Sequence, residues 1–136
     1  MPQQHSAKQT ALAFVAAINF HDLDALVSLL SDDHTFIDAF GEPWQGRATL
    51  RRAWSGYLDW FPDYKITVKE TLVQGNTVVM LGTASGTYAV AGQLPPENYW
   101  EIPAAWKVVA SSGLVTHWQV YADNQPVRDI MSVDED

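Results

Sequence analysis

The chain has 136 residues, 47% of them hydrophobic and 18% charged, which excludes a disordered chain and is the size of one domain. We expect a single domain over residues 1–136, with an ordered core from about 6 to 131. The absence of cysteine excludes disulfides and cysteine-ligated metals, and it fits a cytoplasmic protein. The net charge of −8 argues against a nucleic-acid partner, because phosphates are bound by cations, and no apolar run is long enough for a membrane span.

The first half of the chain has the apolar spacing of helices. One apolar face runs from Ala7 to Asn19 and predicts a first helix. Asp22 is a suitable N-cap for a short second helix. This helix is expected to end at Ser31 and the two aspartates that follow it. A third helix is predicted from Arg47 to Trp60, and Pro62 stops it.

The second half of the chain has the two-residue alternation that is typical of strands. One further short strand is predicted in the first half. The predicted strands are His34–Asp38, Tyr64–Lys69, Thr77–Tyr88, Trp100–Val108 and Leu114–Ala122. Gly75-Asn76 and Ser112-Gly113 predict turns, and Ala91–Asn98 predicts a long hairpin loop. The acidic end of the chain, residues 134–136, is expected to be solvated.

Helices followed by antiparallel strands predict an α+β domain. We expect a cone-shaped, curved sheet, antiparallel or mixed, wrapped around about three N-terminal helices. Such a sheet is not covered by helices everywhere, so its concave face is expected to line a pocket. The 6 Trp, 5 Tyr and 5 Phe suit either a dense core or the wall of an apolar cavity. The candidate substrate-binding residues are Phe14, His34, Trp54, Tyr57, Trp60, Trp100 and Trp106.

Asp38 is the first candidate catalytic residue. It lies on the same side of its strand as Phe36, so it faces the interior if Phe36 does. A carboxylate beside apolar walls is less hydrated and becomes a stronger base. The alternative is that Asp38 only caps the turn that leads to Gly41.

Asp123, at the end of the last strand, is the second candidate. Alternation places it on the same side as Tyr121 and Gln119, so the three enter a pocket together unless a bulge intervenes. Two carboxylates in one pocket can divide into one acid and one base, and Tyr121 or an ordered water then stabilises a carbonyl oxygen. The alternative is that Asp123 is a turn residue before Pro126.

Two further groups of residues have a structural interpretation beside a functional one. His34 and His117 are candidate bases or metal ligands, but no pair of histidines has the spacing of a helical metal site, and we expect no metal. Arg47, Arg51 and Arg52 form the basic cluster of the chain, which is either a solvated helix face or an anion site.

Several segments of the chain resemble a known superfamily. The segments Phe14–Asn19, Asp22–Leu26, Leu30–Asp33 and Phe36–Gly41 resemble the opening of bacterial ketosteroid isomerases. The segment Trp118–Asp123 is similar to the ending of SnoaL-like polyketide cyclases and limonene epoxide hydrolases. All of these proteins belong to the nuclear transport factor 2-like superfamily, which has a cystatin-like fold, and the resemblance covers nearly the whole chain.

The resemblance implies roles for particular residues. Asp38 stands where the isomerases have their proton-shuttling aspartate. Phe14 and Ala104 or Ala105 stand where those enzymes have the hydroxyl and the carboxyl that bind the substrate oxygen. A cyclase or hydrolase is expected to depend on Asp123 instead. The isomerases and cyclases of the superfamily use no cofactor, and the resemblance implies none here.

Two functions stay open. One is a cofactor-independent enzyme that isomerises, cyclises or hydrolyses a small hydrophobic carbonyl compound, with Asp38, Asp123 and Tyr121 as catalytic residues. The other is a non-catalytic small-molecule-binding or interaction domain that has kept the fold. Members of the superfamily commonly pair through the sheet, and the apolar second face of Thr77–Tyr88 is compatible with this, so we expect a homodimer.

Overall fold

The structure of the protein is a computed structural model that describes residues 6–133, so the acidic end expected at 134–136 lies outside the described residues. The helices are α1 (Ala7–Asn19), α2 (Leu23–Ser28), α3 (Arg47–Trp60), the short η1 (Pro96–Asn98) and α4 (Gln125–Val133). The strands are β1 (Leu30–Ile37), β2 (Pro43–Gln45), β3 (Lys65–Gln74), β4 (Thr77–Thr87), β5 (Tyr99–Ser111) and β6 (Leu114–Tyr121). None of the described helices is both long and apolar enough to cross a membrane.

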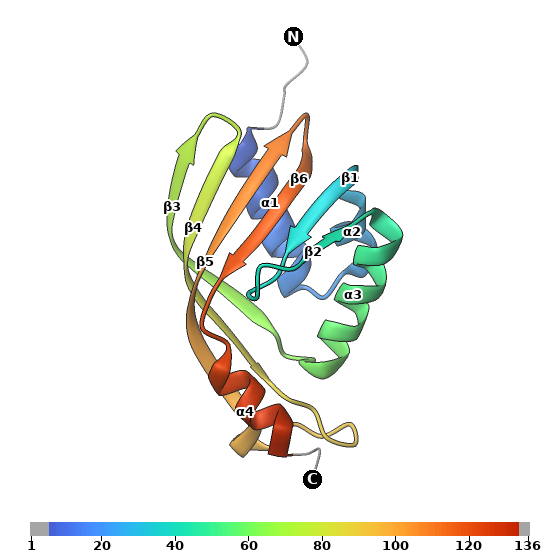
Figure 1. Cartoon of the computed structure of the whole chain (residues 1–136), viewed down its shortest axis with the longest axis vertical. Coiled ribbons are helices and arrows are strands. Elements are labelled where there is room, and N and C mark those ends of the chain that lie inside the picture. The colour runs from blue at the N-terminus through green and yellow to red at the C-terminus, as the bar shows by residue number, and fades with distance from the viewer. Residues whose placement is uncertain (1–5, 134–136) are drawn as a thin grey trace.

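The strands form one mixed sheet in the order β2-β1-β6-β5-β4-β3. β1 pairs with β6 in parallel, and the other neighbours are antiparallel. Figure 1 shows β3, β4 and β5 curving along the length of the molecule, with α1 against one face of the sheet and α3 beyond β1. The predicted α+β class, with a curved sheet and three N-terminal helices, is confirmed.

The hydrophobic core lies between α1–α3 and the inner face of the sheet, which is the face toward α1. Every second side chain along β5 is buried on this face: Trp100, Ile102, Ala104, Trp106, Val108 and Ala110. Phe14 and Ile18 of α1 are fully buried in the same cluster. The strand face that alternation predicts for Trp100–Val108 is therefore confirmed.

Two polar contacts attach the helices to the sheet. At the end of α1, Asn19 donates from Nδ2 to the Ile66 carbonyl at 2.9 Å and accepts the Ile66 N–H at 2.8 Å. After α3, the carboxylate of Asp63 accepts the N–H and the hydroxyl of Thr87 at 2.6 and 2.7 Å. These bonds join segments far apart in the sequence and set where α1 and α3 meet β3 and β4.

β3 bends at a bulge that faces Gly82 of β4. The register between the two strands shifts between Val68 and Glu70. At this point the Thr67 carbonyl comes so close to Gly82 that a Cβ at this position would lie 1.8 Å from its oxygen. Because bulges bend a strand and increase its twist, Gly82 permits the curvature that opens the inner face of the sheet.

Gly82→Ala is expected to destabilise the protein by about 3 kcal/mol or more, because the added methyl group forces the Thr67 backbone to move. In the matched control Gly56→Ala, the methyl group enters open space within α3, and the substitution is expected to stabilise the protein by up to about 1 kcal/mol. Urea unfolding followed by circular dichroism measures both effects. Similar stability of the two variants would contradict the role of Gly82.

The structure differs from the predicted elements in several places, and β3 and β5 run on to Gln74 and Ser111, beyond their predicted ends. The second helix ends at Ser28, because Leu30 already pairs with Val115 of β6 as the start of β1. β2 has three exposed residues at the sheet edge and is too short to show a period. The sequence predicts a turn around Pro126, but α4 begins at Gln125, and proline is tolerated in the first turn of a helix.

Candidate functional site

A cavity of about 580 Å³ opens between α3 and the inner face of the sheet. The side chains that α3 contributes to its wall are Thr49, Leu50, Arg52, Ala53, Trp54, Tyr57 and Trp60. The rest of the wall consists of Phe36, Asp38, Trp44, Tyr64, Trp106, Trp118 and Val120. The wall is therefore mainly aromatic and apolar, which suits a small hydrophobic molecule.

Trp54 lies at the centre of the α3 wall. Its ring packs edge-on against Phe14, Phe36 and Tyr57, with centroids 6.2, 5.9 and 6.0 Å apart. These edge-to-face contacts fix the position of α3 relative to α1 and β1. The indole Nε1–H of Trp54 is buried and has no hydrogen-bond partner among the described residues.

Tyr57 and Tyr64 are the two tyrosines of the cavity wall. Their rings pack edge to face, with centroids 5.0 Å apart. Burial raises the pKa of both tyrosines, and the neighbouring Tyr57 hydroxyl raises the pKa of Tyr64 further. The contact between the two hydroxyl groups lowers the pKa of Tyr57 in turn, against the larger effect of burial, and both side chains keep their protons at neutral pH.

Asp38 lines the cavity and also caps the turn between β1 and β2. Its Oδ1 accepts the backbone N–H groups of Phe40 and Glu42 at 2.9 and 3.0 Å. Its Oδ2 accepts the indole N–H of Trp44 at 3.1 Å. The turn-capping role that the sequence leaves open thus coexists with a place in the cavity wall, and the three donors fix the orientation of the carboxylate.

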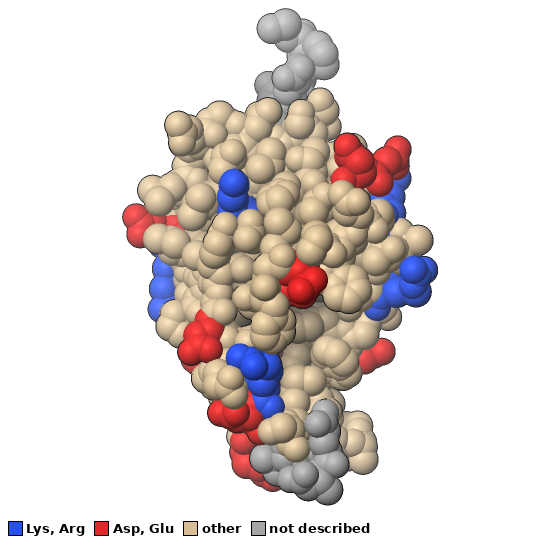
Figure 2. Space-filling model, in the orientation of Figure 1, with Lys and Arg blue, Asp and Glu red and all other residues tan. Residues whose placement is uncertain are grey.

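Asp38 and Arg52 are the two charged residues of the cavity wall. The other members of the basic cluster point elsewhere, because Arg47 pairs with Asp32 and Arg51 pairs with Asp24. Elsewhere on the surface, charges of both signs are scattered. On the face drawn in Figure 2, most of the surface carries no charge.

The structure does not bring Asp123 and Tyr121 to the cavity. Asp123 is exposed, and its Oδ1 accepts the Gln125 N–H at 3.0 Å at the start of α4, which is the turn role considered as the alternative. Tyr121 is 52% exposed. The inner face of β6 is occupied by Trp118 and Val120, so alternation turns Tyr121 outward. The expectation of two carboxylates in one cavity is therefore corrected to a single one, Asp38.

The predicted substrate-binding residues divide into two groups. Trp54, Tyr57, Trp60 and Trp106 line the cavity. Phe14, His34 and Trp100 are buried but do not form part of its wall. The ring centroid of Phe14 lies 4.9 Å from that of Trp118, and the ring centroid of Trp100 lies 5.2 Å from that of Phe61. Phe14 and Trp100 therefore belong to the core.

Several cavity residues were missed by the sequence analysis. Trp118 and Val120 share one side of a predicted strand, and this alternation could have assigned them to the inner face. Thr49 and Arg52 are three residues apart on a predicted helix, a spacing that places them on a common face. Trp44 has no such signal, because the strand that carries it is too short.

His34 is a buried, neutral side chain. Its Nδ1–H donates to the Val115 carbonyl at 2.8 Å, and its buried Nε2 has no partner among the described residues. Burial lowers the pKa of His34 from 6.5; the Val115 hydrogen bond and Asp33 oppose this shift and His117 adds to it. Within the part of the chain that the structure describes, no three His, Asp or Glu side chains are grouped closely enough to bind a metal ion.

Protonation of His34 is expected to destabilise the fold in acid. Because its pKa is lower in the folded than in the unfolded protein, the unfolded state takes up the proton first as the pH falls below about 6.5. The free energy of unfolding then decreases by up to about 1.4 kcal/mol per pH unit until the folded-state pKa is reached. Urea unfolding at a series of pH values measures this slope.

His34→Asn is the variant that tests this assignment, since an amide can still donate to the Val115 carbonyl but does not titrate. The variant is expected to be less stable at neutral pH because the smaller side chain leaves a void. The quantity to compare is therefore the change in the free energy of unfolding per pH unit, and not its value at any one pH. His21→Gln, which replaces another imidazole bonded to a backbone carbonyl, is the control. An unchanged slope in His34→Asn would refute the assignment.

The chain belongs to the SnoaL-like domain family, which matches residues 11–125. Its fold is that of the nuclear transport factor 2-like proteins. A candidate SnoaL-like polyketide cyclase from Shewanella denitrificans has a TM-score of 0.80 at 17% identity, over 93% of this chain and 97% of that one. IdmH, a candidate polyketide cyclase from Streptomyces antibioticus, has a TM-score of 0.77 at 21% identity, over 94% and 99% of the chains.

A third solved structure was determined with a bound ligand. A protein of ketosteroid isomerase-like fold from Catenulispora acidiphila, in complex with trimethylamine, has a TM-score of 0.75 at 20% identity, over 88% of each chain. No curated protein matches the sequence. At these identities the likeness to solved structures establishes the fold alone, because one fold can carry many reactions.

Proposed function

We propose that the protein binds a small, largely apolar carbonyl compound in the cavity and catalyses a cofactor-independent proton transfer on it. The observation that carries this proposal is one carboxylate, Asp38, in the wall of an aromatic cavity of about 580 Å³. The family of the chain and its likeness to candidate polyketide cyclases support a reaction of this class.

In the proposed reaction, Asp38 takes a proton from the carbon next to the carbonyl group and leaves an enolate. The proton then returns to another carbon, which isomerises the compound, or the enolate attacks a second carbonyl and the proton goes to the new alkoxide, which closes a ring. Asp38 is regenerated in either case, so no cofactor is consumed. The hairpin that holds the carboxylate with three donors keeps the base in one orientation.

The negative charge that develops on the carbonyl oxygen needs hydrogen-bond donors. Tyr57 and Tyr64 take this role in the proposal in place of Tyr121, because both line the cavity while Tyr121 is exposed. Their raised pKa values keep the protons on the hydroxyl groups, so they act as donors and not as bases. A donor aimed at such an oxygen is typically worth about 3 kcal/mol of transition-state stabilisation.

Asp38→Asn is expected to lower the rate of proton transfer by about 100-fold to 10,000-fold, because the amide cannot accept the proton. The measurement is deuterium incorporation next to the carbonyl group, or isomerisation followed by absorbance, over a panel of apolar β,γ-unsaturated ketones and 1,3-dicarbonyl compounds. Asp123→Asn, an equivalent change at a carboxylate outside the cavity wall, is expected to keep the wild-type rate. Loss of activity in Asp123→Asn with retention in Asp38→Asn would overturn the proposal.

A second candidate function is binding without catalysis. The observation that favours it is the set of three hydrogen bonds that Asp38 already accepts. These bonds occupy most of the acceptor sites of the carboxylate, which leaves it less able to take a proton from a ligand. In this case ligands bind with similar affinity to the wild type and to Asp38→Asn, and neither incorporates deuterium.

We also propose that two copies pair through the outer face of the sheet. Leu81, Ala105 and Tyr121 lie side by side across β4, β5 and β6 on this face, and all three are at least partly exposed. Light scattering is expected to give about twice the chain mass of 15.1 kDa at micromolar concentration. Ala105→Lys at the centre of this row should give the monomer mass, while the control Ser111→Lys, at the end of the same strand, should not. A monomeric wild type would contradict the pairing.

A further inference from the structure

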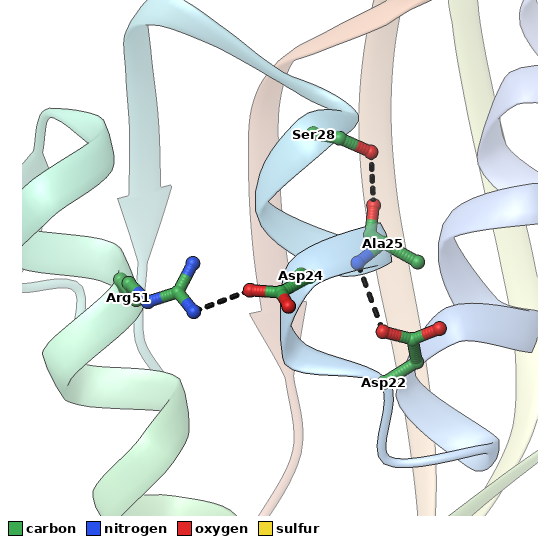
Figure 3. A network of polar contacts seen from close by, with 5 residues as sticks. All are labelled: Asp22, Asp24, Ala25, Ser28 and Arg51. Carbon is green, nitrogen blue, oxygen red and sulfur yellow. Dashed lines mark hydrogen bonds and ion pairs between the residues drawn. The ribbon is translucent and has the colours of Figure 1, made fainter.

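The arginines of α3 have different surroundings although they are close in the sequence. Arg47 donates from Nη1 to Asp32 at 3.0 Å and from Nε to a backbone carbonyl at 2.8 Å. Arg51 reaches from α3 to Asp24 on α2, as Figure 3 shows. Both guanidinium groups therefore have carboxylate partners within the protein.

Arg52 has no such partner. Outside α3, Arg128 lies over the ring of Phe40 at 5.0 Å and donates to a side-chain oxygen at 2.9 Å. Among the side chains that the structure describes, none ion-pairs, hydrogen-bonds or stacks with the guanidinium of Arg52. All four arginines of the chain lie in the described part, so Arg52 is the exception among them.

The helical geometry of α3 explains this difference. Consecutive residues of a helix point about 100° apart, so Arg51 faces α2 while Arg52 faces the cavity. Arg52 contributes to the cavity wall beside Thr49 and Ala53, whose short side chains leave room for a guanidinium group. A positive charge that pairs with no described side chain thus stands in a cavity wall that is mainly aromatic and whose other charged residue is Asp38.

We propose that Arg52 binds the carboxylate of the ligand, which makes the ligand an apolar molecule with an acidic group. This inference rests on the proposed function, which supplies the apolar carbonyl part of the ligand, and it adds an acidic group to that ligand. The planar guanidinium group presents paired N–H donors that match the two oxygens of a carboxylate. The carbonyl part of the same molecule would lie against the aromatic wall within reach of Asp38, so the substrate class is an apolar keto acid.

The overall charge of the protein does not oppose this assignment. The net charge is −8, but exposed charges beyond about 8 Å are largely screened at physiological ionic strength. The other charged group of the cavity wall, Asp38, already accepts three N–H donors, whereas the guanidinium of Arg52 pairs with no described side chain. The local guanidinium group therefore decides which charge the cavity accepts.

The test compares three ligands that share one naphthalene body: 2-naphthylacetate, the neutral 2-naphthylacetamide and 2-(2-naphthyl)ethylammonium. Calorimetric titration gives the dissociation constant of each with the wild type, Arg52→Gln and Arg51→Gln. The two variants lose the same charge at adjacent positions, but only Arg52 belongs to the cavity wall. Arg52 is exposed, so its replacement should leave the fold intact, and thermal unfolding checks this.

With the wild type, the carboxylate is expected to bind about fivefold more tightly than the amide, which is the upper end for an exposed ion pair. The preference should disappear in Arg52→Gln, persist in Arg51→Gln and shrink in high salt. Equal binding of acid and amide, an equal loss in both variants, or tightest binding of the ammonium compound would overturn the proposal. If none of the three compounds binds, both this inference and the proposed function fail.

The two ideas fail separately in other cases. Binding of the amide without any gain for the acid removes the role of Arg52 and leaves the apolar cavity as a binding site. Tight, Arg52-dependent binding of the acid, combined with no proton transfer that depends on Asp38, supports the inference about the ligand and removes the catalytic proposal.

Discussion

The close approach of the Thr67 carbonyl to Gly82 is the constraint on which the cavity depends. It exists because β3 carries a bulge, and it is tolerated because position 82 has no side chain. The bulge bends β3, and β4 and β5 follow it through their paired backbone groups. A flatter sheet would bring Trp106 and Trp118 closer to α3 and fill the space that now forms the cavity.

Curvature alone does not keep the cavity open, because protein interiors tend toward dense packing. Two further features oppose collapse. The bond of Asp63 to Thr87 fixes the chain just after α3 to β4. The edge-to-face contacts of Trp54 set the distance between α3 and the sheet, since rigid rings cannot rearrange to fill the space beside them. The aromatic content of the chain is therefore divided between core packing and cavity wall.

The fold could be predicted from periodicity, but the site only in part. Alternation assigns the inner face of β5 correctly, and helical spacing brings Trp54, Tyr57 and Trp60 to the cavity. The outward direction of Tyr121 could have been inferred from Trp118 and Val120, which share the opposite side of the strand, but Asp123 lies beyond the end of β6, where alternation no longer applies. The difference between Arg51 and Arg52 was also hidden, since it depends on Asp24 of another helix.

The chemistry of the cavity follows from which polar groups the protein leaves without a partner. Asp38 is held by three donors, so it can act as a base only from a fixed position and with competition from the turn. Arg52 is a charged donor group of the cavity wall that pairs with no described residue, whereas the indole N–H of Trp54 is enclosed in the core. A guanidinium group at the edge of an aromatic wall favours a ligand with an acidic oxygen group, because a charge-assisted hydrogen bond is stronger than one between neutral groups. A ligand with a carbonyl and a carboxylate meets this requirement with its two polar ends, and the aromatic rings between them accommodate its apolar body.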